Sequence, residues 1–204
     1  PGAADERHLR VRFTLSALAE EGEIASPPIE MRFVDQRMFG GLLVSQGGAV
    51  VPTEIAHIAR DPLDPEFDEA DFVRRARRRT SAVKRLLLDQ GLVSGVGNIY
   101  ADEALWRARV HPLTPAAELT RAQVMELHRA LREVLASAVA AQGTNLSDYR
   151  TVRGRTGEYA GQLLAYGRAG EACPRCGTPM ERVVIGQRGT TFCPSCQRLP
   201  RGRG

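Results

Sequence analysis

The stretch KRLLLDQGLVSGVGNIYADEAL, residues 84–105, decides the fold of the helical part of this chain. Apolar residues recur at helical spacing from Phe72 to Asp89, with arginines on the other face. A turn follows over Leu92–Asn98, because its glycines adopt backbone angles that other residues avoid. Ile99–Arg109 returns to helical spacing and stops before His111-Pro112, since a residue that precedes proline disfavours the helical conformation. The stretch therefore predicts two helices joined by a glycine-rich turn.

The residues on either side complete an α+β pattern. Thr120–Ala141 predicts a third helix, with Thr120 as its N-cap and Gly143 at its end. Upstream, alternating apolar and polar residues predict strands over residues 8–14 and 29–34, and Phe39–Ser45 predicts another. We expect a β-rich remnant, then a helical domain, then a small β-hairpin domain at the C-terminal end.

All four cysteines lie in that last part, as two pairs with two residues inside each pair: Cys173, Cys176, Cys193 and Cys196. Residues 177–192 separate the pairs, a length that is typical of a zinc site. Two disulfides are the alternative, but they suit a secreted protein, and the sequence opens with no signal segment. We predict one structural Zn²⁺ with four thiolate ligands. Arg182–Ile185 and Thr190–Phe192 would form a hairpin around Gly186–Gly189.

Charge is divided unevenly along the chain, although the net charge is only +4. Residues 1–70 hold thirteen acidic residues and six arginines, whereas residues 71–204 hold twenty-two basic and eleven acidic residues. The basic surplus favours a polyanionic partner, and solvated basic helix faces are the alternative. No apolar run is long enough to span a membrane, so we expect a cytoplasmic, nucleoid-associated monomer.

Composition also suggests where domains begin and end. Residues 61–70 (DPLDPEFDEA) are acidic and interrupted by prolines, which is typical of a linker. We therefore predict a partial β domain over residues 1–60, a linker over 61–70, a helical domain over 71–160 and a zinc finger over 161–204.

Residues 84–105 closely resemble the helix–two-turn–helix motif of the formamidopyrimidine-DNA glycosylase and endonuclease VIII family. Three further motifs match that family in the same order: Val34–Gly40 resembles its void-filling loop, Ala165–Arg168 the segment before its finger, and Gln187–Cys193 its finger hairpin. The Val34–Gly40 pattern is similar to the 8-oxoguanine branch. The resemblance implies a β-sandwich for the N-terminal remnant, and a glycosylase and abasic-site lyase that repairs double-stranded DNA with oxidised or abasic lesions.

The resemblance also assigns DNA contacts in the helical domain. It implies that Asn98 donates to a phosphate, although a simple helix cap is the alternative from the residue alone. Lys84 and Arg79 would neutralise the DNA backbone, and the alternative for the arginine run is a solvated helix face. His8 matches a family position that contacts DNA, whereas a histidine in a strand is otherwise a structural residue.

Three more residues match positions that act at the lesion. By resemblance, Arg37 reads the base left opposite the extruded nucleotide and Phe39 stacks into the gap. Arg188, at the tip of the finger hairpin, would contact phosphates around the flipped nucleotide and assist the second elimination step. A surface arginine is the alternative for Arg188. In the lesion-capping loop, near residues 153–161, Glu158 departs from the two aromatic residues that are usual after the glycine.

The family's nucleophile is an N-terminal proline amine, followed directly by glutamate, with a lysine on a later β-hairpin. Here Gly2 follows Pro1, and the single lysine of the chain, Lys84, belongs to the helical domain. We expect a truncated piece of a glycosylase, or a shortened paralogue, that binds DNA better than it cuts it. The alternatives are a catalytically inactive paralogue that binds damaged or abasic DNA, and an unrelated RNA-associated zinc-ribbon protein.

Overall fold

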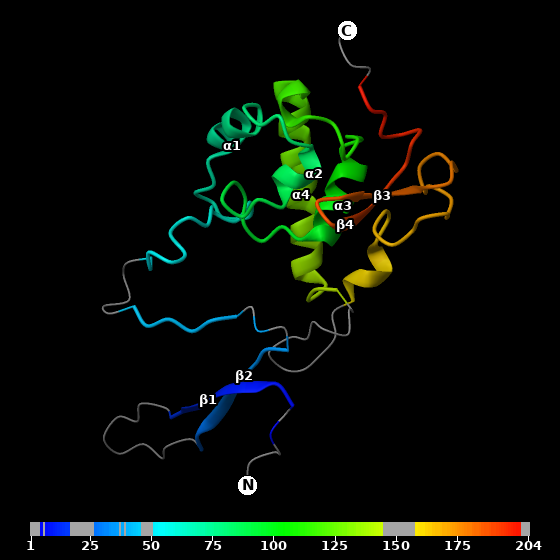
Figure 1. Cartoon of the computed structure of the whole chain (residues 1–204). Helices are drawn as coiled ribbons and strands as arrows, with labels where there is room; N and C mark the ends of the chain where they lie inside the picture. The colour runs from blue at the N-terminus through cyan, green and yellow to red at the C-terminus, as the bar shows by residue number, and fades with distance from the viewer. Residues whose placement is uncertain are drawn as a thin grey trace. The chain divides into compact units, whose positions relative to one another are not determined.

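The computed structural model describes residues 5, 7–16, 27–36, 38, 40–45, 51–144 and 158–200. The chain divides into two compact units, residues 1–52 and residues 53–204 (Figure 1). The mixed helix and strand content confirms the α+β fold class.

The first unit contains one antiparallel strand pair, β1 (Leu9–Leu15) and β2 (Ile29–Val34), which confirms the two alternating segments as strands. The strand predicted over residues 39–45 is wrong for its described part, because residues 40–45 form no strand. Instead, the Asp35 carboxylate turns the chain after β2. It accepts the Met38 N–H at 2.9 Å and the Gly40 N–H at 2.7 Å, in place of a strand partner.

The first two helices of the second unit are α1 (Glu69–Ala76) and α2 (Val83–Leu87). The single helix predicted over residues 72–89 is therefore wrong, because the chain leaves the helix between Ala76 and Val83. That interval pairs with a distant segment: Val83 N–H donates to Thr114 O at 2.8 Å, and Ala116 N–H donates to Ser81 O at 3.0 Å. Backbone partners far along the sequence thus replace two turns of helix.

The glycine turn and the helix after it are confirmed. Gly95 has φ +77°, in the left-handed region that glycine reaches without strain, and α3 spans Asn98–Arg107. The helix ends two residues earlier than expected, and Arg109 then takes φ +56° as the chain turns away.

The third predicted helix is also confirmed, as α4 (Arg121–Ala140). The Thr120 hydroxyl accepts the Gln123 N–H at 3.2 Å, and Gln123 Oε1 accepts the Thr120 N–H at 2.9 Å. This reciprocal capping box fixes the start of the helix. After α4, Gly143 has φ +90° and reverses the chain. Among the described residues, the helices are accompanied by two short 3₁₀ turns, η1 (Ala116–Glu118) and η2 (Tyr159–Gln162).

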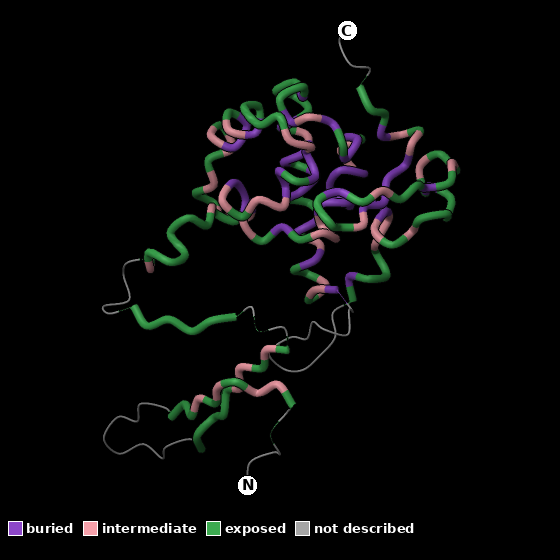
Figure 2. Tube along the Cα trace, in the orientation of Figure 1, coloured by how far each residue is buried: buried purple, intermediate pink, exposed green. Residues whose placement is uncertain are grey.

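The core of the second unit lies between these helices, as the buried segments in Figure 2 show. It includes Phe72, Leu87, Val93, Leu105, Val124 and Leu131. Leu63 and Phe67 pack against the same cluster, and Arg132 donates to Pro62 O. The structure therefore places residues 61–68 of the expected linker on the helical unit, and Glu69 and Ala70 in α1.

The C-terminal finger is a hairpin of β3 (Glu181–Ile185) and β4 (Arg188–Phe192), paired antiparallel with Ile185 opposite Arg188. Only Gly186 and Gln187 lie between the strands, with φ of +57° and +63°. Two successive positive φ angles are the geometry of a two-residue hairpin turn whose twist matches the strands. The turn is thus tighter than the predicted Gly186–Gly189 loop.

Candidate functional site

The four cysteines come together at the base of the hairpin. Their Sγ atoms all lie within 4.8 Å of one another, and Cys176 Sγ is 3.5 Å from Cys193 Sγ and 3.4 Å from Cys196 Sγ. Four thiolates at zinc–sulfur distances of about 2.3 Å form a tetrahedron with edges of about 3.8 Å. The cluster fits that ion, and the cysteines form a site for one structural zinc.

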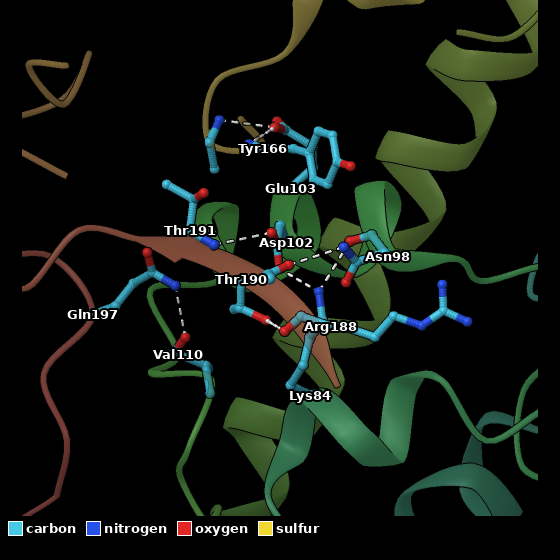
Figure 3. A network of polar contacts seen from close by, with 12 residues as sticks. Lys84, Asn98, Asp102, Glu103, Val110, Tyr166, Arg188, Thr190, Thr191 and Gln197 are labelled. Carbon is cyan, nitrogen blue, oxygen red and sulfur yellow. Dashed lines mark hydrogen bonds and ion pairs between the residues drawn. The ribbon is translucent and has the colours of Figure 1, made fainter. Parts of the chain in front are cut away.

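A buried glutamine, Gln197, forms hydrogen bonds to the backbone of a cysteine in the second pair and to the backbone after α3. Gln197 Oε1 accepts the Cys193 N–H at 2.8 Å. Its Nε2 donates to Val110 O at 2.9 Å, as Figure 3 shows. Val110 follows α3, so this side chain ties the zinc ligands to the helical core.

The Gln90 side chain forms two hydrogen bonds to the backbone of the glycine turn. Gly95 N–H donates to Gln90 Oε1 at 3.1 Å, and Gln90 Nε2 donates to Val96 O at 3.0 Å. A Cβ built on Gly97 would meet nothing within 4 Å, so the space beside this backbone is open. Open backbone before a helix N-terminus leaves N–H groups available to an anion.

Asn98, the first residue of α3, joins the glycine turn to the finger. Its Nδ2 donates to Gly189 O at 2.9 Å, a contact between residues far apart in the sequence (Figure 3). An amide nitrogen carries two N–H donors, so one remains for another acceptor. Asn98 Oδ1 is buried and has no hydrogen-bond partner among the described residues.

Lys84 lies in the interior rather than on a DNA-facing surface. Its side chain is 0% exposed, pairs with Asp102 and donates to Asn98 O at 3.0 Å. The other oxygen of Asp102 accepts the Thr191 N–H from β4 at 3.0 Å. Burial lowers the pKa of Lys84 and raises the pKa of Asp102, because both charged groups are removed from water. This burial does not fit the expected contact between Lys84 and a phosphate.

Arg188 is the first residue after the two-residue turn, and its side chain is exposed. In Figure 3 its guanidinium points away from the buried network around Lys84 and Asp102. The positive charge of Arg188 also contributes to lowering the pKa of Lys84. A cation at a hairpin tip, beside the amide of Asn98, is a suitable arrangement for a phosphate group.

Glu103, next to Asp102 on α3, binds the segment that leads into the finger. Its buried carboxylate accepts the Leu164 N–H at 3.0 Å, the Ala165 N–H at 2.8 Å and the Tyr166 N–H at 2.9 Å. Three consecutive N–H groups on one carboxylate form an anion nest and fix the backbone there.

The other residues that the sequence predicted as DNA contacts either have different partners or lie outside the described residues. Arg79 is exposed and pairs with Asp89 at 3.3 Å. His8 belongs to the first unit, where its carbonyl accepts the Asp35 N–H at 3.0 Å. Arg37 and Phe39 lie outside the described residues, as do residues 153–157 of the expected lesion-capping loop.

Sequence reasoning missed four residues that organise the site: Asp102, Glu103, Gln197 and Trp106, whose Nε1 donates to Cys173 Sγ at 3.4 Å. Two adjacent acidic residues in the apolar run ADEALW were a usable signal, because buried acids need partners. Nothing local identified those partners, which lie in the finger and before it.

Two family models match the chain. A model described as the formamidopyrimidine-DNA glycosylase H2TH domain matches residues 58–150, and one described as the zinc finger found in FPG and IleRS matches residues 170–199. A helical domain with a glycine turn and an attached four-cysteine finger thus defines the class of protein.

Individual relatives cover both units. The chain is 60% identical to the formamidopyrimidine-DNA glycosylase of a Nocardioides species over 204 residues, which is 100% of this chain and 67% of the relative. The structure of MutM (Fpg) from Thermus thermophilus matches with a TM-score of 0.76 and 41% identity, over 92% of this chain and 73% of that one. Lactococcus lactis Fpg, solved with DNA that contains an abasic site, matches with a TM-score of 0.71 and 30% identity, over 92% and 71%.

The chain belongs to the formamidopyrimidine-DNA glycosylase family of base-excision repair enzymes. It spans about two thirds of the length of the Nocardioides relative. Within the described residues, none of the helices combines the length and apolarity that crossing a membrane requires.

Proposed function

We propose that this chain binds duplex DNA that carries an oxidised purine or an abasic site, and that it serves removal of 8-oxoguanine and formamidopyrimidines. Asn98 and Arg188 bind phosphates on either side of the contact between the glycine turn and the finger hairpin. In the natural full-length protein, Arg188 then assists strand cleavage by neutralising the phosphate that leaves in the second elimination. Arg37 and Phe39 act at the vacated base position, and His8 and Arg79 are further DNA contacts.

One observation supports this proposal above the others. The hydrogen bond from Asn98 Nδ2 to Gly189 O, at 2.9 Å, brings the glycine turn and the tip of the finger together. Each alone is a weak anion site, one with helix N–H groups and one with a guanidinium. Side by side, they can hold neighbouring phosphates of one strand.

Lys84 supports the same interface from the protein interior. Because its ammonium is paired with Asp102 and bonded to Asn98 O, it orients the start of α3 and the hairpin strand β4 together. We therefore assign Lys84 an internal role in this interface and leave the phosphate contacts to Asn98 and Arg188.

Fluorescence anisotropy of a labelled duplex tests the phosphate contacts. Arg188→Gln should weaken binding and reduce the slope of log K against log salt by about one, because one cation no longer displaces counterions. Asn98→Ala should weaken binding about tenfold on lesion-containing and undamaged duplexes alike, since a phosphate contact carries no sequence information.

Arg129→Gln is the matched control, because Arg129 is an exposed arginine on α4 that pairs with Glu126 and Glu133. It should leave the salt slope nearly unchanged. Equal slopes for Arg188→Gln and the parent chain would remove Arg188 from the phosphate interface. A change in lesion preference for Asn98→Ala would remove Asn98 from a purely phosphate role.

The covalent chemistry is a separate part of the proposal. In the family it starts from a proline amine followed by glutamate, whereas Gly2 follows Pro1 here. We therefore expect residues 1–204 to bind lesion DNA without forming a Schiff base. Borohydride reduction in the presence of 8-oxoguanine or abasic DNA should give no cross-linked species, and a cross-linked species would contradict this expectation.

The second candidate is a paralogue of the same ancestry that recognises damaged or abasic DNA without catalysis. Glu158, in place of an aromatic residue in the lesion-capping loop, favours it. Strand cleavage by the natural full-length protein, measured on an 8-oxoguanine duplex, separates the two: cleavage favours the enzyme, and binding without cleavage favours the paralogue.

A further inference from the structure

Helix α3 presents three side chains to the finger at four-residue spacing. Residues four apart lie on one face of a helix. The three side chains and their partners are Asn98 with Gly189 O, Asp102 with the Thr191 N–H, and Trp106 with Cys173 Sγ. The first two reach the hairpin, and the third reaches a ligand of the zinc centre.

The Trp106 contact is a buried hydrogen bond to sulfur. Its Nε1 lies 3.4 Å from Cys173 Sγ, and the two residues are 6% and 3% exposed. A buried indole N–H normally finds an acceptor, and here that acceptor is the sulfur of Cys173. Because water is excluded, the bond is electrostatically stronger than it would be at the surface.

Arg175, which lies between Cys173 and Cys176, strengthens the same contact. Its guanidinium carbon is 4.1 Å from the centre of the Trp106 ring. It also donates to Trp106 O at 3.0 Å and to Arg107 O at 3.4 Å, at the C-terminal end of α3 where a cation is favoured. A cation over the ring withdraws electron density from it, which makes the indole N–H a better donor.

We propose that Trp106 is a positioning residue of the zinc centre, whose indole N–H donates to the zinc-bound Cys173 thiolate, tightens zinc binding and ties zinc retention to α3. Four thiolates and one zinc ion leave two negative charges in excess, and a donor aimed at one sulfur offsets part of that charge. Partners behind metal ligands change metal affinity by about 10–100-fold when they are removed.

The zinc-affinity test compares three versions of the full chain: the parent, Trp106→Phe and Met180→Leu. Trp106→Phe keeps an aromatic ring, but it removes the N–H donor together with part of the buried indole ring. Met180 belongs to the same buried cluster as Trp106 and Cys173, so Met180→Leu controls for packing. Competition with a chromophoric chelator should show a zinc dissociation constant about tenfold higher for Trp106→Phe and within about twofold of the parent for Met180→Leu.

Cobalt substitution gives a readout that packing alone does not move. A hydrogen bond to a thiolate makes the sulfur a poorer electron donor and raises the energy of the sulfur-to-Co²⁺ charge-transfer band. That band should therefore shift to lower energy in Trp106→Phe and stay in place in Met180→Leu. In Arg175→Gln, which leaves the indole intact, it should shift the same way by less.

An unshifted cobalt band in Trp106→Phe would overturn the proposal, whether or not the zinc affinity falls. A shifted band with unchanged zinc affinity would overturn its claim that the bond tightens zinc binding. If Trp106→Phe fails to fold, an unshifted band in Arg175→Gln overturns the proposal instead. These measurements contain no DNA, so their outcome is independent of the function proposed above.

Discussion

His111 is a buried base whose neutral form holds the turn after α3. Its Nδ1 accepts the Leu113 N–H at 3.1 Å, and its ring packs edge-on against Phe192 with 4.6 Å between ring centres. Burial lowers the pKa of His111, and the nearby Glu181 opposes that shift more weakly. Protonation would convert the accepting nitrogen into a donor and would break the bond to Leu113.

Because burial lowers the pKa of His111, its hydrogen bond stabilises the fold more at neutral pH than at acidic pH. The folded-state pKa lies below the unfolded value of about 6.5, so the contribution is fully present above that value. It is lost as the pH falls toward the folded-state pKa. We expect the free energy of unfolding to fall between pH 7 and pH 5, by about 1 kcal/mol from the lost hydrogen bond.

His111→Asn is the matched variant, because an asparagine oxygen can accept the same N–H and does not titrate. Urea unfolding at both pH values should show a smaller loss in this variant than in the parent chain. The zinc thiolates titrate in both proteins, so the difference between them isolates His111. Equal losses would contradict the assignment.

At the scale of elements, α3 is the helix on which the second unit is assembled. One face carries Asn98, Asp102 and Trp106 toward the finger, and Glu103 binds the backbone of residues 164–166. The position of the finger therefore depends on buried polar contacts from a single helix, in addition to apolar packing.

Replacing Glu103 tests that dependence. Glu103→Gln keeps the shape but has one acceptor oxygen for three N–H groups, so buried donors lose their partner. We expect a loss of about 2–3 kcal/mol in the free energy of unfolding, measured with urea and the fluorescence of Trp106, the single tryptophan. Glu133→Gln, on the exposed face of α4, should cost less than about 1 kcal/mol, and equal costs would contradict the role of Glu103.

The elements differ in how far the sequence predicts them. The glycine turn, α3, α4 and the cysteine cluster were predictable because their signals are local: residue spacing, turn glycines and a helix cap. The break between α1 and α2 was not, because it depends on pairing with residues 114–116. Lys84 illustrates the same limit, since helical spacing places a lysine on a face but does not identify Asp102 and the finger as its surroundings.

At the scale of the whole molecule, two of the three buried apolar clusters described in the second unit should depend on zinc to different degrees. The larger one lies among α1, α2, α3 and α4 and contains no cysteine. The smaller one joins Trp106 to Cys173, Met180 and Cys193. Removing zinc takes away the structural link between the cysteines, and we expect the larger cluster to persist because it contains no zinc ligand. The helices and the finger should therefore respond differently to metal removal.

Chelation of the full chain separates these two responses. We expect the far-UV circular dichroism signal of the helices to persist, because their core needs no metal, while affinity for an abasic duplex falls at least tenfold. The affinity should fall because Arg188 and Gly189 lose the fixed hairpin that places them beside Asn98. Added zinc should restore binding, and magnesium should not, because it prefers oxygen ligands. Undiminished affinity after complete zinc removal would show that the hairpin tip contributes nothing to DNA binding, and collapse of the helical signal would show that the two clusters form one cooperative core.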